Sequence, residues 1–161
     1  MKVLVLADTH ISASRPGRRL PDRVYERLDE ADAVLHAGDV TAPALLHEIE
    51  GFAPVHAVLG NNDVALRLPE RLEVPLGGVR VAMVHDSGPS SGRTGRLRRW
   101  FPDAGVVVFG HSHLPWREID PGGQLHLNPG SPTERRRAPT RTVGWLELDG
   151  GDVLRADILE V

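Results

Sequence analysis

Short apolar runs that end in Asp, Asn or His are the feature that most constrains the fold of this chain. Val3 to Ala7 is the first such run, and Asp8 follows it at once. Runs of this kind are typical of strands buried on both faces of a sheet. The polar fragments that follow the runs are Asp8-Thr9-His10, Gly38-Asp39, Gly60-Asn61-Asn62-Asp63, His85 and Gly110-His111-Ser112-His113. We therefore expect them to gather along one edge of a sheet, where α/β proteins build their sites.

The donor side chains in these fragments suit two divalent metal ions. They are two Asp, one Asn and four His: Asp8, His10, Asp39, Asn61, His85, His111 and His113. This set is too large for one tetrahedral zinc, but it suits two five- or six-coordinate ions that share a carboxylate. Asp39, alone after its glycine, is the expected bridge. Two ions roughly 3.5–4 Å apart hold a hydroxide and clamp phosphoryl oxygens. The set predicts phosphoester hydrolysis, with Asp39, Asn61 and His85 at the catalytic centre.

A simpler interpretation is that these side chains only cap turns at strand ends. It suffices for any one of them, but burying all of them together without counter-charge would be costly. Bound metal supplies that counter-charge. The remaining histidines lie outside the fragments and are expected to have structural or surface roles: His36, His47, His56 and His126.

The ordered fragments resemble those of the calcineurin-like metallophosphoesterase superfamily. The short length and the turn Asn128-Pro129-Gly130-Ser131 resemble its small phosphodiesterase branch, which also contains a retromer subunit of the same fold. The resemblance implies a two-sheet α-β-β-α sandwich and attack by a metal-bridging hydroxide, without a covalent enzyme intermediate. It also implies two ligand sets, namely Asp8, His10, Asp39 and His113 for one ion and Asp39, Asn61, His85 and His111 for the other.

The chain departs from the wider family at two positions. Larger phosphatases of the superfamily carry Gly-Asn-His-Glu, in which the His protonates the leaving group, but this chain has Asn62 at that place. The Asn62 amide cannot act as an acid, so water, a metal-bound ligand or a neighbour such as Asp63 would have to protonate the leaving group. General acid catalysis is worth about 10²–10⁴ in rate. The small branch usually continues its fourth fragment with Gly-His, whereas here His85 precedes Asp86.

Periodicity predicts an α/β fold with two sheets flanked by helices. Leu20 to Ala31 and Ala42 to Phe52 carry apolar residues at spacings of three and four, so both are expected to be crossover helices. Thr94 to Phe101 is a short helix candidate. The later strands are expected at Trp116 to Asp120, Gln124 to Leu127, Arg141 to Leu148 and Val153 to Leu159.

Composition predicts a single domain over residues 1–161. The chain has 161 residues and 40% hydrophobic content, enough for one core. A net charge of −3 and a pI near 6.2 give no field that favours nucleic acid or an anionic membrane. The absence of Cys leaves nitrogen and oxygen ligands, which suit Mn, Fe, Ni or Zn. No stretch approaches about 18 apolar residues, and Met1 to Ala7 is too short for a signal segment. A cytoplasmic protein is expected.

Arginines gather after two of the site fragments. They are Arg15, Arg18 and Arg19, and then Arg93, Arg96, Arg98 and Arg99. Such runs are usually solvated faces, but Arg93, in the loop after His85, is the best candidate for a fork onto a substrate phosphate. Arg135 to Arg137 is a second candidate. Asn128, in its Pro-Gly turn, is the other expected substrate contact, although a plain tight turn explains the same residues.

Two classes of function remain open from the sequence. The first is a phosphodiesterase acting on a small phosphoester; a phosphomonoesterase is disfavoured by Asn62, and a nuclease by the lack of a basic stripe with interleaved aromatics. The second is a binding scaffold of the same fold with slight or no activity. The intact ligand set favours the enzyme, and a homo-oligomer is compatible with either class.

Overall fold

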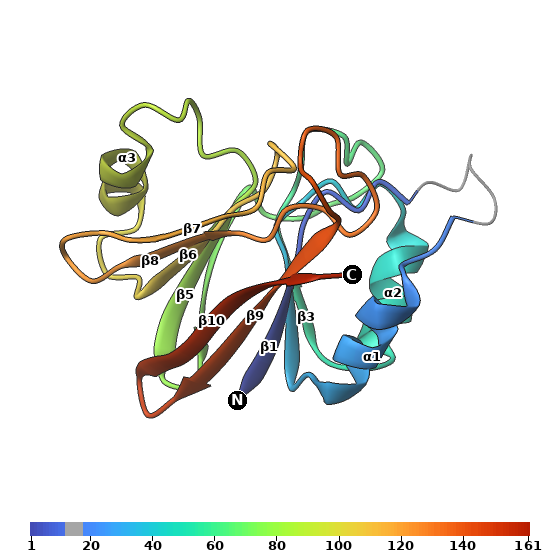
Figure 1. Cartoon of the computed structure of the whole chain (residues 1–161), viewed down its shortest axis with the longest axis horizontal. Coiled ribbons are helices and arrows are strands. Elements are labelled where there is room, and N and C mark those ends of the chain that lie inside the picture. The colour runs from blue at the N-terminus through green and yellow to red at the C-terminus, as the bar shows by residue number, and fades with distance from the viewer. Residues whose placement is uncertain (12–17) are drawn as a thin grey trace.

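Two five-stranded sheets packed face to face form the centre of the molecule, which the computed structural model describes over residues 1–11 and 18–161 (Figure 1). Arg15, one of the clustered arginines, lies outside the described residues. In this described part, α1 (Asp22–Glu30) and α2 (Pro43–Glu50) lie on the outer side of one sheet, and α3 (Arg93–Trp100) lies on the outer side of the other (Figure 1). No helix among the described residues has the length and apolarity needed to cross a membrane.

The first sheet has the strand order β10-β9-β1-β2-β3. Its strands are β1 (Lys2–Leu6), β2 (Ala33–His36), β3 (Val55–Ala57), β9 (Thr142–Asp149) and β10 (Asp152–Glu160). β1, β2 and β3 are parallel, while β9 and β10 are antiparallel additions. Parallel neighbours need crossover connections, and α1 (Asp22–Glu30) and α2 (Pro43–Glu50) provide them.

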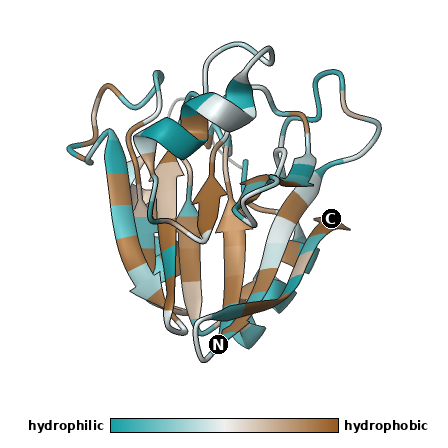
Figure 2. Cartoon of the chain, turned by 90° about the vertical axis from the view of Figure 1, so that its left-hand side faces the viewer, coloured by the Kyte–Doolittle hydropathy of each residue, from teal (hydrophilic) through white to brown (hydrophobic). Residues whose placement is uncertain are grey.

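The second sheet has the strand order β4-β5-β6-β8-β7. Its strands are β4 (Arg71–Leu76), β5 (Val79–Val84), β6 (Val106–Val108), β7 (Trp116–Ile119) and β8 (Leu125–Asn128). β5, β6 and β8 are parallel, and the two edge strands are antiparallel to their neighbours. Helix α3 (Arg93–Trp100) connects β5 to β6 and crosses in front of the apolar central strands in Figure 2.

Alternation along β1 shows how the layers are built. Val3 and Val5 face the second sheet and join the core between the sheets, together with Val81 and Met83 of β5. Leu4 and Leu6 face the opposite way and pack against α1 and α2. Because both faces of the strand are covered, nearly every residue in it is apolar and buried.

The structure confirms the expected two-sheet sandwich and its flanking helices. It differs from the sequence analysis in one strand, because Arg71–Leu76 was not predicted to form β4. Pro75 interrupts the strand signal there, and the structure accommodates it because β4 is an edge strand that pairs only with β5. The polar fragments also do not follow one sheet: three follow β1, β2 and β3, and two follow β5 and β6.

Candidate dimetal site

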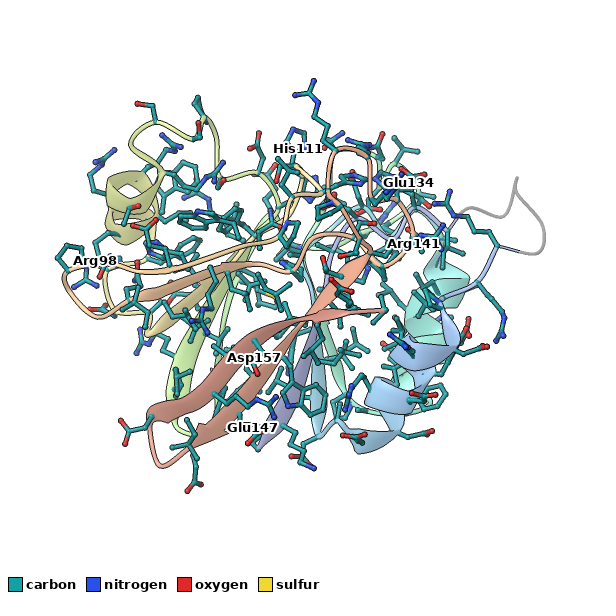
Figure 3. The ribbon with its side chains drawn as sticks, in the orientation of Figure 1. Arg98, His111, Glu134, Arg141, Glu147 and Asp157 are labelled. Atoms are coloured by element: carbon teal, nitrogen blue, oxygen red, sulfur yellow. The ribbon has the colours of Figure 1, made fainter. Side chains whose placement is uncertain are left out.

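The predicted donor residues converge where the strand ends of the two sheets meet. They come from five loops: Asp8 and His10 after β1, Asp39 after β2, Asn61 after β3, His85 after β5, and His111 and His113 after β6. The backbone N–H of His111 donates to Oδ1 of Asp8 at 3.2 Å and so ties the two sheets together. Figure 3 shows His111 and Glu134 at the end of the molecule where these loops gather, with Glu147 toward the opposite end.

Most of the donors have a left-handed backbone conformation. The φ angles are 54° at Asp8, 45° at His10, 58° at Asp39, 68° at His111 and 58° at His113. Non-glycine residues adopt this region rarely, and each instance costs on the order of 1–3 kcal/mol. The surrounding structure therefore holds these loops against their local preference, as is common at functional sites.

Asp8, His10 and His113 form one group of donor atoms, which lie within 4.8 Å of one another. Nε2 of His10 lies 3.2 Å from Nε2 of His113, and the two rings stack with centroids 5.0 Å apart. Nε2 of His113 lies 3.6 Å from Oδ1 of Asp8. Imidazole nitrogens and a carboxylate that converge in this way are suited to one divalent cation.

Asn61, His85 and His111 form a second group around the amide oxygen of Asn61. This Oδ1 lies 3.0 Å from Nε2 of His85 and 2.9 Å from Nδ1 of His111. Oδ2 of Asp39 lies 3.5 Å from Nε2 of His85 and 3.4 Å from Nε2 of His10 in the first group. The Asp39 carboxylate thus lies between the two groups, as a bridging ligand must.

Backbone carbonyls orient two of the imidazole rings. Nδ1 of His85 donates to the carbonyl of Ala37 at 2.7 Å, and Nδ1 of His113 donates to the carbonyl of Glu134 at 2.9 Å. A carbonyl only accepts, so Nδ1 carries the proton in both rings and a neutral ring directs its Nε2 lone pair into the site. Metal-binding histidines in proteins are commonly oriented by such hydrogen bonds.

Asp8 is the clearest indication that the site holds cations. Its side chain is fully buried, and Oδ2 has no hydrogen-bond partner among the described residues. Burial and the nearby Asp39 carboxylate raise the pKa of Asp8 to about 8. Two carboxylates and several imidazoles with too little counter-charge are costly to bury. Divalent cations would offset that cost, so the residues present fit a two-metal centre.

Asn62 holds the Asp39 carboxylate in place. Its backbone N–H donates to Oδ1 of Asp39 at 2.9 Å, and its side-chain amide donates to Oδ2 at 2.7 Å. Burial raises the pKa of Asp39, but these hydrogen bonds and the nearby histidines outweigh burial and keep that pKa below its usual value. Asp39 is therefore ready to bind cations as a carboxylate.

Gly60 allows the loops after β2 and β3 to approach closely. A Cβ at this position would lie 2.1 Å from the backbone nitrogen of Asp39 and 2.2 Å from its Oδ1. Any side chain here would push the Asp39 loop away, so the Gly-Asn pair keeps the two ligand-bearing loops in contact.

Asp63 is a positioning residue that the sequence analysis considered only as a proton donor. One carboxylate oxygen accepts from the backbone N–H groups of Asp39 at 2.9 Å and Gly60 at 2.8 Å, and the other accepts from that of Thr41 at 2.7 Å. The side chain is buried. Both oxygens are thus occupied as acceptors, and Asp63 shapes the Asp39 loop. Its place three residues after a loop glycine was the only available signal.

Asn128 lies behind the site, where it holds the loop that carries His111 and His113. Its amide nitrogen donates to the carbonyl of Gly110 at 2.9 Å and to Oγ of Ser112 at 3.1 Å, and its Oδ1 accepts from the N–H of Gly130. Because its side chain is buried and all its polar atoms have protein partners, we propose a positioning role for Asn128 in place of the direct substrate contact expected from the sequence.

Ser131, the last residue of the Asn128 turn, also supports the site. Its hydroxyl donates to the carbonyl of Asp8 at 2.7 Å and accepts the N–H of Glu134 at 2.9 Å. The turn expected around Asn128 therefore connects the Asp8 loop to the segment that receives the His113 hydrogen bond.

Arg93 packs against aromatic rings. Its guanidinium carbon lies 5.1 Å from the ring centroid of Phe109 and 5.4 Å from that of Trp116. Its Nε is buried and has no hydrogen-bond partner among the described residues. The expected contact of Arg93 with substrate phosphate remains a prediction.

The chain is similar to known phosphoesterases in sequence and fold. Residues 1–151 match the model of the calcineurin-like phosphoesterase superfamily domain. A probable metallophosphoesterase of Methanothermobacter thermautotrophicus is 35% identical, with 99% of this chain and 92% of the relative covered. The crystal structure of a predicted phosphoesterase from Streptococcus pneumoniae is 25% identical, with 99% and 88% coverage and a TM-score of 0.71. Vps29 of Chaetomium thermophilum shares the fold at 19% identity, 99% and 95% coverage and a TM-score of 0.79.

Fold and site together define a two-sheet α/β protein whose strand-end loops form a candidate metal centre. The family match covers most of the chain, and the Methanothermobacter relative is similar over nearly its full length. This protein belongs to the calcineurin-like phosphoesterase superfamily.

The three hydrogen bonds of Asp63 predict that Asp63→Asn weakens the fold. An amide NH₂ would replace one acceptor oxygen and face a backbone donor, so the free energy of unfolding should fall by about 1.5–3 kcal/mol. Urea unfolding measures this change, with Asp103→Asn on the surface as the matched control. Unchanged stability, with an activity loss confined to poor leaving groups, would instead identify Asp63 as a proton donor.

His36 should make the metal-free protein less stable in acid. It is fully buried, its Nε2 lies 3.0 Å from Oγ1 of Thr9, and burial, reinforced by nearby His85, lowers its pKa to about 3. The unfolded chain takes up this proton below about pH 6.5 and the folded chain does not, so folding loses about 1.4 kcal/mol per pH unit from pH 6.5 toward 3.

The test compares urea unfolding of wild type, His36→Gln and His47→Gln at pH 6.5 and 5. The wild type should lose about 2 kcal/mol more than His36→Gln over this interval, whereas the exposed His47 control should follow the wild type. Parallel pH profiles for wild type and His36→Gln would contradict the assignment.

Proposed function

We propose that this protein is a metal-dependent phosphodiesterase that hydrolyses a small phosphodiester. The observation that carries the proposal is the convergence of the predicted donors in two adjacent groups, one of which contains the buried Asp8. Oδ2 of Asp8 has no hydrogen-bond partner among the described residues. Membership of the superfamily supports hydrolysis of a phosphoester. The choice of a diester rests on residues beside the site.

The ligand roles follow the two groups of donor atoms. Asp8, His10 and His113 would hold one ion, Asn61, His85 and His111 the other, with Asp39 shared between them. When bound, two divalent cations would polarise the phosphoryl oxygens and supply activated water at neutral pH. Mn, Fe, Ni and Zn all suit the nitrogen and oxygen donors.

The chain's own residues hold this centre rigid. The carbonyl of Ala37 fixes the ring of His85, and Asn62 fixes both oxygens of Asp39. Asp63 in turn fixes the backbone of the Asp39 loop. A preorganised centre of this kind does not have to reorient its ligands as the charge on the phosphoryl group develops.

A diester substrate fits the roles of Asn62 and Asp63, neither of which is available as an acid. Asn62 donates its amide to Asp39, and Asp63 has both oxygens occupied by backbone donors. Neither residue is placed to protonate a departing alkoxide. Esters whose leaving groups are stable as anions do not need that proton, and activated diesters meet this requirement.

A binding scaffold is the alternative that the likeness to Vps29 favours. At 19% identity this likeness concerns the fold. The scaffold hypothesis predicts no turnover of phosphoesters with any metal.

The direct test is turnover by metal-stripped protein reloaded with Mn²⁺, Ni²⁺, Zn²⁺ or Mg²⁺. The panel contains aryl phosphodiesters, cyclic nucleotides and phosphomonoesters, and we expect metal-dependent cleavage with diesters preferred.

Asp39→Asn should lose at least about 100-fold in metal affinity, because a neutral amide offsets less of the repulsion between two cations. Elemental analysis should then find neither ion retained, while the surface control Asp149→Asn keeps both. Two fully occupied ions in Asp39→Asn would exclude the bridge, and no turnover with any metal would favour the scaffold.

Because neither Asn62 nor Asp63 is placed to protonate a leaving group, we expect a steep dependence of rate on the leaving group. In a series of diesters with increasingly basic leaving groups, kcat/KM should fall sharply. Asn62→His should raise kcat/KM for the esters with the poorest leaving groups by up to about 10²-fold. Asn62→Ala controls for the lost hydrogen bonds to Asp39, and a structure of the variant checks the placement of the new ring. A shallow dependence in the wild type would mean that another group supplies the proton.

A further inference from the structure

A pocket of about 320 Å³ opens beside the second group of donors. Asn61 and His85 line it on the side of the metal centre, and Arg71 lines it on the side of β4. The volume is near the lower end of those that hold small organic ligands. A phosphoester bound at the metal centre would therefore have room here for one organic group.

Arg71 is held at this pocket by the sheet. It pairs with Val84 in the register of β4 and β5, and Val84 directly precedes His85. Its guanidinium carbon lies 4.2 Å from the ring centroid of Trp100, within the range of a cation–π contact. No described residue makes a hydrogen bond or ion pair with the guanidinium of Arg71. Its N–H donors are thus positioned by Trp100 and free to bind an acceptor.

The other walls of the pocket are partly apolar and partly acidic. Leu59 and Val84 contribute apolar surface, while Glu70 and Asp86 contribute exposed carboxylates. One positive and two negative side chains disfavour a second phosphate in this pocket. A neutral planar ring with both carbonyl and N–H groups complements all of these side chains. Its faces would contact the apolar side chains, its carbonyl would accept a hydrogen bond from Arg71, and its N–H would donate to a carboxylate.

We propose that this pocket binds an uncharged heteroaromatic group of nucleobase type, with Arg71 as its specificity-determining residue. The proposal rests on the phosphodiesterase function in placing the phosphate at the metal centre. Arg93, the arginine favoured by its sequence position, faces Phe109 and Trp116 and does not line the pocket.

The test measures binding by calorimetry to protein loaded with Mn²⁺. Thymidine 5′-monophosphate and ethyl phosphate carry the same phosphate but differ in the organic group. We expect the nucleotide to bind at least about tenfold more tightly, and Arg71→Ala to weaken the nucleotide about tenfold while leaving ethyl phosphate unchanged. Arg99→Ala, an exposed arginine on α3, is the matched control. Metal content and circular dichroism check that Arg71→Ala retains its site and its fold.

Equal affinities for the two ligands in the wild type would overturn the proposal. So would an equal loss of both in Arg71→Ala, because Arg71 would then contact phosphate. Turnover separates this result from the proposed function: an intact nucleotide preference without hydrolysis of any diester would refute the phosphodiesterase and leave the pocket assignment standing. Hydrolysis of diesters without a nucleotide preference would support the phosphodiesterase and refute the pocket assignment.

Discussion

The burial of two neighbouring carboxylates, Asp8 and Asp39, is the constraint on which the rest of the structure depends. Burial, reinforced by the nearby Asp39 carboxylate, raises the pKa of Asp8, whose Oδ2 has no hydrogen-bond partner among the described residues. Folded proteins tolerate such an arrangement when counter-charge compensates for it or function requires it. The left-handed backbone at most of the donor residues adds to the cost. The loops are therefore organised for binding cations at the expense of local stability.

Rigid strands make this arrangement possible. β1, β2 and β3 end in one sheet and β5 and β6 in the other, and each strand end is fixed by a core in which side chains such as Val5 and Met83 are fully buried. Asp63 and Ser131 then transmit that rigidity to the loops through hydrogen bonds to backbone groups. Sites assembled from loops on such a scaffold can be strained without endangering the fold.

The sequence predicts the sandwich, which the structure confirms, and the candidate metal donors, because both leave local signals. A β-branched run followed by Asp or His is visible in single fragments such as the one ending at Asp8. The division of the fragments between two sheets has no local signal, because it depends on which strands pair. The role of Asp63 depends on three hydrogen bonds to residues before it in the chain, and only the folded geometry shows them. Pro75 weakens the strand pattern of β4, so the sequence did not predict this strand or the position of Arg71 in it.

The distribution of the donors over two sheets has a mechanical consequence. Ions bound at this centre would join the end of the first sheet, through residues such as Asp39, to the end of the second, through residues such as His85. The chain has no cysteine, so cations would provide the cross-link that a disulfide provides in other small proteins. Binding and folding are then thermodynamically linked: a ligand at 100 times its dissociation constant stabilises the folded state by about 2.7 kcal/mol. By the same linkage, separation of the two sheets would release the metal, and the centre would report on the integrity of the sandwich that carries it.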